Sequence, residues 1–390
     1  KPLSAREFPT ASLGENQESE TEASAPGPNA FFTICAKNFL AHARALHDSI
    51  QPHYPDARFF VVLCDRVDGL FDPVREPFEF IYLEELKLPN LADMANRYNI
   101  TEFNTSVKPF AFLRLMQDFQ FDSVVYLDPD LFFVDRMLEI DQLLADGAEA
   151  ILTPHILEPA EQDQIHDRNM LQFGIYNLGF LALRNTPSVQ AFLQWWGRRL
   201  EKDCVIRLED GLFVDQKWAD LLPAFVPGAK ILHHPGYNVA YWNLPQRNIT
   251  KEDSCWFANG QPLRFVHFSG NKLDDVTTFS RHSQQVTIEN IGILRELLDT
   301  YQREVYKQGH AFYRSLPYAY SWVGVSGVNL HTPQELDLAT QATQKPSSAA
   351  GAVGVAVHQN FEKTPFRRRY SVMRQAVPVA KRLSGGWVPF

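Results

Sequence analysis

The pattern of apolar and polar positions divides the chain into strands that alternate with helices. Apolar runs rich in β-branched and aromatic residues predict strands at 30–36, 58–64, 78–83, 123–127, 150–153, 174–183, 229–233 and 264–268. Helical spacing of apolar residues predicts helices at 39–50, 107–117, 135–146, 188–199, 211–222 and 288–308. The opening strand–helix–strand order requires a right-handed crossover, so we predict an α/β fold with a parallel sheet.

The two ends of the chain differ in composition from its middle. Residues 1–28 hold few large apolar groups and many Glu, Ser, Ala, Pro and Gly residues, which predicts disorder. Residues 340–390 carry eight Lys and Arg against one Glu. We therefore predict a disordered segment at 1–28, a folded domain at 29–285, a helical extension at 286–335 and a low-complexity, basic tail at 336–390.

The basic tail has two interpretations. Arg367 to Arg369 precede spaced apolar residues, so the segment could lie on an anionic membrane surface. The alternative is a solvated, mobile tail. Binding to liposomes with and without residues 357–390 separates the two.

Composition excludes several classes of protein. With 45% apolar and 21% charged residues the chain is typical of globular proteins. A net charge of −9 argues against nucleic-acid binding by the whole chain. The four cysteines show no metal or redox spacing, no apolar run is long enough to span a membrane, and no signal peptide is present, so we expect a cytoplasmic protein.

The strand at 123–127 ends in Asp128-Pro129-Asp130. In parallel sheets, ligands bind beyond the carboxyl ends of the strands, so both carboxylates are expected where a ligand would lie. Hard oxygen ligands suit Mg²⁺ or Mn²⁺, which in turn hold diphosphates. The simpler interpretation is that Asp-Pro-Asp is a polar turn.

Over residues 30–275 the sequence resembles the GT-A-fold glycosyltransferases, and most of all the retaining family of glycogenin and the bacterial lipopolysaccharide galactosyltransferases. Four motifs in order carry the resemblance: Tyr126 to Asp130 as the Asp-x-Asp strand, Asn177 to Gly179 as an Asn-x-Gly turn, Asp215-Gln216 as an Asp-Gln pair, and His267 to Lys272 as a late His-x-x-Gly motif followed by Lys. The resemblance implies a mixed, mostly parallel sheet flanked by helices, with helical C-terminal additions.

The resemblance also implies roles for individual residues. Asp128, Asp130 and His267 would bind the divalent metal, Mn²⁺ or Mg²⁺, and the His ligand favours Mn²⁺. The donor, a nucleotide sugar of the UDP-sugar type, would contact Asn38, Lys108 or Arg114, Gly179, Gly270 and Lys272. Asn177, Asp215 and Gln216 would line the sugar and acceptor side, with Gln216 near the reacting carbon.

The sequence departs from the family pattern at two places. Ala36-Lys37 stand where family members often carry an acidic residue on the nucleotide base, so Asp65 is the candidate for the ribose or base. The Lys of the late motif comes one residue early and no Lys-Pro-Trp ending follows. The nucleotide and the diphosphate geometry are therefore left open.

The resemblance implies a metal-dependent transfer of a hexose to a hydroxyl with retention. The acceptor is a glycan, a lipid-linked sugar or a protein. Two alternatives stay open: a sugar nucleotidyltransferase, although the Gly-rich loop it needs is absent after the first strand, and a non-catalytic carbohydrate-binding protein of the same fold. Residues 237–243, rich in aromatic and amide side chains, are an expected acceptor wall.

Overall fold

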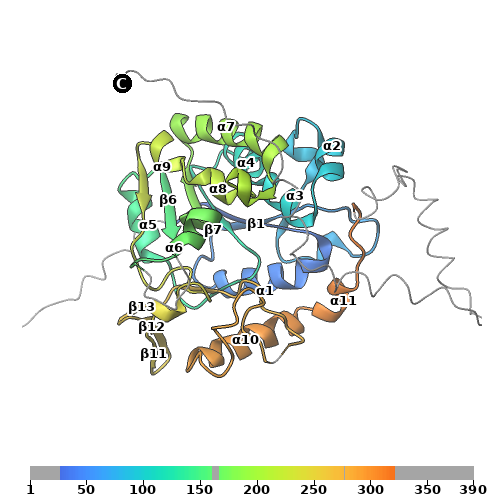
Figure 1. Cartoon of the computed structure of the whole chain (residues 1–390). Coiled ribbons are helices and arrows are strands. Elements are labelled where there is room, and N and C mark those ends of the chain that lie inside the picture. The colour runs from blue at the N-terminus through green and yellow to red at the C-terminus, as the bar shows by residue number, and fades with distance from the viewer. Residues whose placement is uncertain (1–26, 160–166, 276, 321–390) are drawn as a thin grey trace, which may run out of the picture. The chain divides into compact units, whose positions relative to one another are not determined.

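A seven-stranded sheet forms the centre of the computed structural model, which describes residues 27–159, 167–275 and 277–320 (Figure 1). Every neighbouring pair is parallel except the two made by β7, which runs antiparallel to both β4 and β6. The predicted mixed, mostly parallel sheet is therefore confirmed. Its strands in spatial order are β10 (Ala229–Ile231), β6 (Ala150–Pro154), β7 (Tyr176–Arg184), β4 (Ser123–Leu127), β1 (Ala30–Cys35), β2 (Arg58–Leu63) and β3 (Glu79–Tyr82).

Helices cover both faces of this sheet, because its buried strands alternate their side chains between two apolar layers. Phe31 and Val61 point into one layer, and Phe32 and Val62 into the other. The first layer is covered by α1 (Leu40–Ile50), α5 (Leu138–Ala145), α10 (Leu294–Lys307) and α11 (His310–Arg314). The second is covered by α2 (Leu91–Arg97), α3 (Ile100–Ser106), α4 (Lys108–Leu113), α7 (Pro187–Asp203), α8 (Gln216–Ala219) and α9 (Leu222–Phe225).

Smaller pairings of strands lie outside the main sheet. The antiparallel pair β5 (Leu131–Phe133) and β14 (Phe265–His267) brings a late segment beside the end of β4. The helix α6 (Asp167–Phe173) precedes β7. The remaining strands form a ribbon of β11 (Ile249–Glu252), β12 (Cys255–Ala258) and β13 (Gln261–Pro262) and a pair of β8 (Ile206–Arg207) and β9 (Leu212–Phe213).

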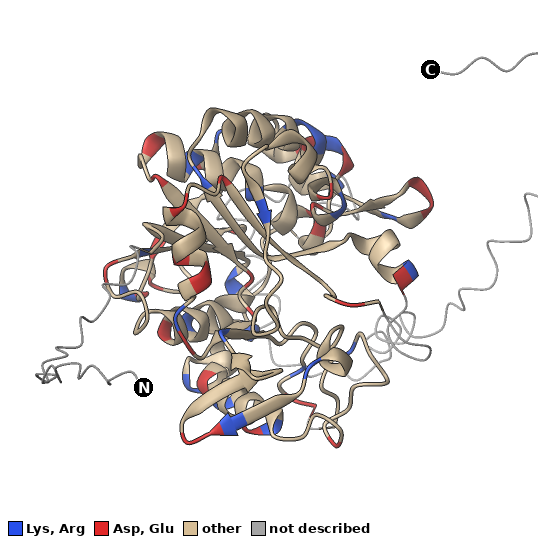
Figure 2. Ribbon diagram, turned by 90° about the vertical axis from the view of Figure 1, so that its left-hand side faces the viewer, with Lys and Arg blue, Asp and Glu red and all other residues tan. Residues whose placement is uncertain are grey.

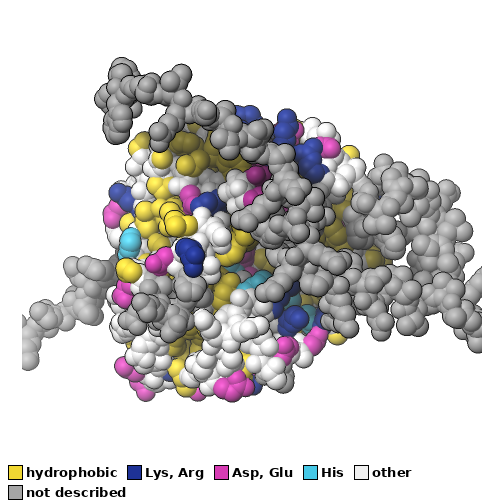
Figure 3. All heavy atoms as spheres, viewed as in Figure 1, with side chains coloured by type: hydrophobic (Ala, Val, Ile, Leu, Met, Phe, Trp, Pro, Cys, Tyr) yellow, Lys and Arg dark blue, Asp and Glu magenta, His cyan; other side chains and the backbone are white. Residues whose placement is uncertain are grey.

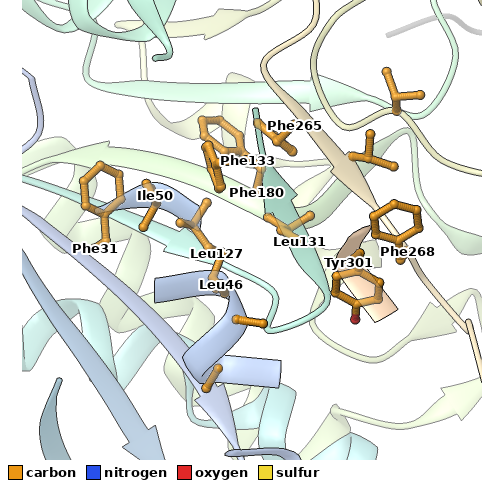
Figure 4. Packing of buried hydrophobic residues seen from close by; sticks show 14 of the residues in the cluster. Phe31, Leu46, Ile50, Leu127, Leu131, Phe133, Phe180, Phe265, Phe268 and Tyr301 are labelled. Atoms are coloured by element: carbon orange, nitrogen blue, oxygen red, sulfur yellow. The ribbon is translucent and has the colours of Figure 1, made fainter. Parts of the chain in front are cut away.

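The core of the first layer joins segments far apart in the sequence (Figure 4). Tyr301 of α10 stacks on Phe268 with ring centroids 4.4 Å apart and meets Phe132 edge-on. The predicted C-terminal helices therefore share one core with α1 and with the β5–β14 pair.

The helix predicted over 211–222 is wrong in its first half. Gly211 and Val214 both have left-handed backbones, at φ +69° and +41°, and β9 lies between them. The helix begins only at Gln216. A left-handed β-branched residue is sterically costly, so Val214 is a strained position directly before Asp215.

No helix within the described residues is long and apolar enough to cross a membrane. The predicted tail and the segment before residue 27 lie outside the described residues. Lys and Arg residues are interspersed with Asp and Glu residues on the outer helices and loops, while the central strands carry few charges (Figure 2). The face seen in Figure 3 shows the same mixture, with hydrophobic, basic and acidic groups in small patches.

Candidate functional site

Asp128 and Asp130 lie in the tight connection between β4 and β5. The Leu131 amide donates to the Asp128 carbonyl, so Asp-Pro-Asp is a turn, and both carboxylates face the end of β14. The register of β14 pairs His267 with Leu131, which places the imidazole beside the acids. One ligand atom from each of the three side chains lies within 4.8 Å of the other two.

The imidazole of His267 interacts electrostatically with both carboxylates. Nε2 of His267 lies 3.0 Å from Oδ1 of Asp130 and 3.6 Å from Oδ2 of Asp128. Burial lowers the pKa of His267, but the Asp130 charge and hydrogen bond, with Asp128, outweigh burial, and the net shift is upward. Burial raises the pKa of Asp128; it also acts on Asp130, where the charge and hydrogen bond of His267 prevail and lower the pKa.

Within the described ranges, no Lys or Arg forms an ion pair with Asp128 or Asp130. The Asp130 charge raises the pKa of Asp128, so the two carboxylates repel each other, and a divalent ion between them would relieve that repulsion. The set of two carboxylates and one imidazole suits Mn²⁺. The residues therefore fit the metal that the resemblance implies.

Tyr126 positions one of the two acids. Its hydroxyl donates to Oδ1 of Asp128 over 2.5 Å, and burial raises the Tyr126 pKa well above its ordinary value. Tyr126 lies in β4 and Asp128 comes two positions later, directly after the strand, so the two side chains point to the same side and can meet.

The far side of His267 is fixed by Asn238. Nδ1 of His267 lies 3.0 Å from Oδ1 of Asn238, which is 1% exposed and left-handed at φ +50°. The Asn238 amide nitrogen donates to Thr153 and to Asn177, each over 3.0 Å.

The predicted turn at Asn177 to Gly179 is wrong, because these residues continue the strand β7, which holds Asn177 in the interior. Its Oδ1 accepts the Gly179 amide at 2.9 Å, and its Nδ2 lies 3.2 Å from Nε2 of His155. A Cβ on Gly179 would come within 2.4 Å of the His267 ring, so only glycine permits this approach. This part of β7 therefore leaves room for the imidazole of His267.

Lys108 and Asp215 form a second buried group beside the same part of β7. Nζ of Lys108 lies 2.5 Å from Oδ2 of Asp215, donates to the Leu178 carbonyl over 3.0 Å, and sits 4.0 Å from the Tyr126 ring centroid. Gln216 accepts from the Leu178 amide and donates to the Phe173 carbonyl. Gln216 thus joins the backbone of β7 to the end of α6.

The structure places other predicted residues elsewhere. Arg114 forms ion pairs with Glu85 and Asp118 and does not join this group. Asp65 accepts from Nζ of Lys37 at 3.0 Å and from three backbone amides.

Gly270 is left-handed at φ +72°, and a Cβ there would reach His282 within 2.4 Å. Lys272 is exposed in the turn that follows β14, and Asn38 is half-buried in the segment after β1. Their donor contacts stay predictions.

The expected acceptor wall is largely a buried corner. Of residues 237–243, Tyr237, Asn238, Trp242 and Asn243 are at most 5% exposed, and the Tyr237 hydroxyl is used by Glu139. The Trp242 ring packs edge-on against His155 and His267 at 5.3 and 5.2 Å. Alternation of aromatic and amide residues could not distinguish this corner from an exposed wall.

Sequence reasoning missed His155 and Thr153, which follow one another closely at the end of β6. Both are buried, and burial lowers the pKa of His155 to about 4, so the ring is neutral. The available signal was their position at the carboxyl end of the predicted strand that follows the Asp-x-Asp strand in the sequence.

Comparison with known proteins gives distant relatives. No family model matches the chain. The uncharacterized protein YfnD of Bacillus subtilis is 25% identical over 252 residues, which cover 62% of this chain and 78% of YfnD.

Several solved structures similar to this chain are glycosyltransferases. The galactosyltransferase LgtC is 17% identical with a TM-score of 0.37, over 61% of this chain and 86% of LgtC. Mouse xyloside xylosyltransferase 1 is 14% identical with a TM-score of 0.36, over 61% of this chain and 96% of that one. The glycosyltransferase GlyE of Streptococcus pneumoniae is 14% identical with a TM-score of 0.39, over 83% of this chain and 66% of GlyE. Likenesses this distant leave the activity to be argued from the site.

Proposed function

We propose that this chain is a metal-dependent glycosyltransferase that moves a hexose from a UDP-sugar to a hydroxyl acceptor with retention. The observation that carries the proposal is the convergence within 4.8 Å of Asp128, Asp130 and His267, the last of which comes 137 residues after Asp130. Mn²⁺ held there would neutralise the negative charge that develops on the departing nucleoside diphosphate.

The residues around this centre would orient the donor. Lys108 is buried with Asp215 and donates to the Leu178 carbonyl, so its charge is fixed beside Asn177 of β7. We place the donor sugar there. Lys272, exposed after β14, would contact the diphosphate as a point charge.

Retention requires attack from the face that the leaving group occupies, or a covalent intermediate. Asp215, whose partner Lys108 donates to the Leu178 carbonyl, is 2% exposed and already paired, which disfavours it as a nucleophile. We therefore favour same-face attack by the acceptor hydroxyl, with a departing phosphate oxygen as the base. Isolation of a glycosyl-enzyme or an inverted product would contradict this.

Turnover of nucleotide sugars tests the function. With Mn²⁺, a panel of nucleotide sugars should yield free nucleoside diphosphate by slow hydrolysis, and EDTA should abolish the release. A nucleotidyltransferase would produce pyrophosphate from a sugar phosphate and a nucleoside triphosphate, and a binding protein would release nothing.

The site also suggests the kind of acceptor, and the composition of the chain suggests a location. A glycan, lipid-linked or protein hydroxyl would suit the chemistry, and we propose a cytoplasmic protein whose basic tail contacts the inner membrane. Co-sedimentation with anionic liposomes should fall when residues 357–390 are removed; equal binding would contradict the contact.

A further inference from the structure

His267 is the end of a chain of hydrogen bonds whose direction is fixed by two backbone groups. At one anchor, the Gly179 amide can only donate, so the atom of Asn177 that faces it over 2.9 Å must be the carbonyl oxygen Oδ1. At the other, the Ile175 carbonyl can only accept, so Nδ1 of His155, 3.2 Å away, carries a proton.

These anchors orient both amides. Nδ2 of Asn177 donates to the bare Nε2 of His155, in agreement with the neutral ring. Since Oδ1 of Asn177 is an acceptor, the atom of Asn238 that faces it must be the amide nitrogen. Oδ1 of Asn238 therefore faces His267, and Nδ1 of His267 must donate to it.

We propose that Asn238 is a positioning residue that keeps a proton on Nδ1 of His267, so that Nε2, which faces Asp130 over 3.0 Å, is the nitrogen that gives up its proton to bind a metal. An isolated imidazole carries no such fixed choice, because either nitrogen can hold the proton of the neutral ring. Metal-binding histidines are commonly oriented by a partner on the second ring nitrogen. The inference rests on the proposed metal centre.

Three further observations indicate that Asn238 serves this geometry. Both protons of its amide have acceptors, in Thr153 and Asn177, so it has no freedom to reverse. Its left-handed backbone, which asparagine tolerates better than most residues, lets Val239 bridge to β14 and accept the His267 amide at 2.8 Å. Trp242 packs against the ring edge-on.

The experiment reads the ring directly. The protein holds twelve histidines, and selective ¹⁵N labelling with a His267→Gln spectrum assigns the resonances of His267. In wild type, two-bond ¹H–¹⁵N correlation should show a protonated Nδ1 both in the metal-free protein and with diamagnetic Mg²⁺ bound, while the proton on Nε2 should be lost as Mg²⁺ binds. A bare Nδ1 would overturn the proposal, whether or not any variant folds.

Metal binding gives the second measurement. Asn238→Gly keeps the left-handed backbone and removes the acceptor, so Mn²⁺ titrated by EPR should bind about 10- to 100-fold more weakly. Thr153→Val should give a smaller loss, and unchanged affinity in Asn238→Gly would refute the positioning role.

Asn259→Gly is the matched control, because Asn259 has the same φ of +50° outside the site and should bind like wild type. If wild type shows the expected Nδ1 proton but binds no Mn²⁺, the metal centre of the proposed function fails while the orientation of His267 stands.

Discussion

Two charged groups occupy the carboxyl ends of neighbouring strands, and they differ in how their charge is balanced. After β1 and β2, Lys37 and Asp65 form a 3.0 Å ion pair with both side chains fully buried. After β4, Asp128 and Asp130 keep side chains 31% and 21% exposed and face an imidazole. The first group is closed and the second is open to a ligand.

The difference shows what an acidic residue at this edge can do. Every acceptor of Asp65 is used, by Lys37 and by backbone amides that include Ala319. The predicted role of Asp65 on the ribose or base would compete with those bonds, whereas a cation at Asp128 and Asp130 would replace repulsion. A balanced pair stabilises the fold, and an unbalanced one is available for chemistry.

The largest expected effect is in the closed group. Lys37→Met leaves Asp65 as a buried, uncompensated charge, so the free energy of unfolding should fall by about 3–5 kcal/mol. Urea denaturation measures it. Adding Asp65→Asn to the same chain should restore part of the loss; a single-variant loss below about 1 kcal/mol would contradict the comparison.

In the open group, Asp130→Asn should cost function and spare the fold. Removing a ligand of a site worth several kcal/mol should lower donor turnover about 10²- to 10³-fold and weaken Mn²⁺ binding. Unfolding free energy should change by less than about 1 kcal/mol, because the substitution relieves repulsion. Asp253→Asn, on an exposed turn, is the control, and a loss like that of Lys37→Met would erase the distinction.

The open group should also respond to pH. The pKa of His267 is raised by Asp130 and Asp128 against the opposing effect of burial, and metal binding needs the bare ring. Mn²⁺ affinity should therefore fall about tenfold per pH unit below that raised pKa and level off above it. His267→Gln should bind weakly without this slope; an equal slope in the variant would assign the titration elsewhere.

Stability of the metal-free protein should run the opposite way. Because the folded pKa of His267 is raised, its contribution is fully present below the ordinary value of 6.5 and is lost as pH rises through the raised pKa. Thermal melts of wild type and His267→Gln across this window measure the difference, which Mn²⁺ should reverse.

The smallest effect should come from Tyr126→Phe. It removes the 2.5 Å hydrogen bond to Asp128 while keeping the ring beside Lys108, so Mn²⁺ affinity should fall about tenfold or less. Titration by EPR gives the number. A loss as large as that of Asp130→Asn would show that the hydroxyl does more than orient the carboxylate.

The sequence by itself determined the local rules. Apolar runs rich in β-branched and aromatic residues predicted the strands, and the Asp-x-Asp after one of them predicted both the turn and the acidic edge. It failed where local preference was overridden, as at Val214, whose left-handed backbone delays the helix to Gln216. Such strain is set by packing and leaves no periodicity to read.

Only the tertiary structure decided which charges are satisfied. Lys37 and Asp65, or Lys108 and Asp215, become balanced pairs through strand order and helix packing between segments 28 and 107 residues apart, which no spacing in the sequence records. The β5–β14 register likewise brings His267 to Asp130, and the bridge between Val239 and Val266 brings Asn238 to His267. Residue types fix what chemistry is available, and long-range packing fixes which of those groups stay unpaired to perform it.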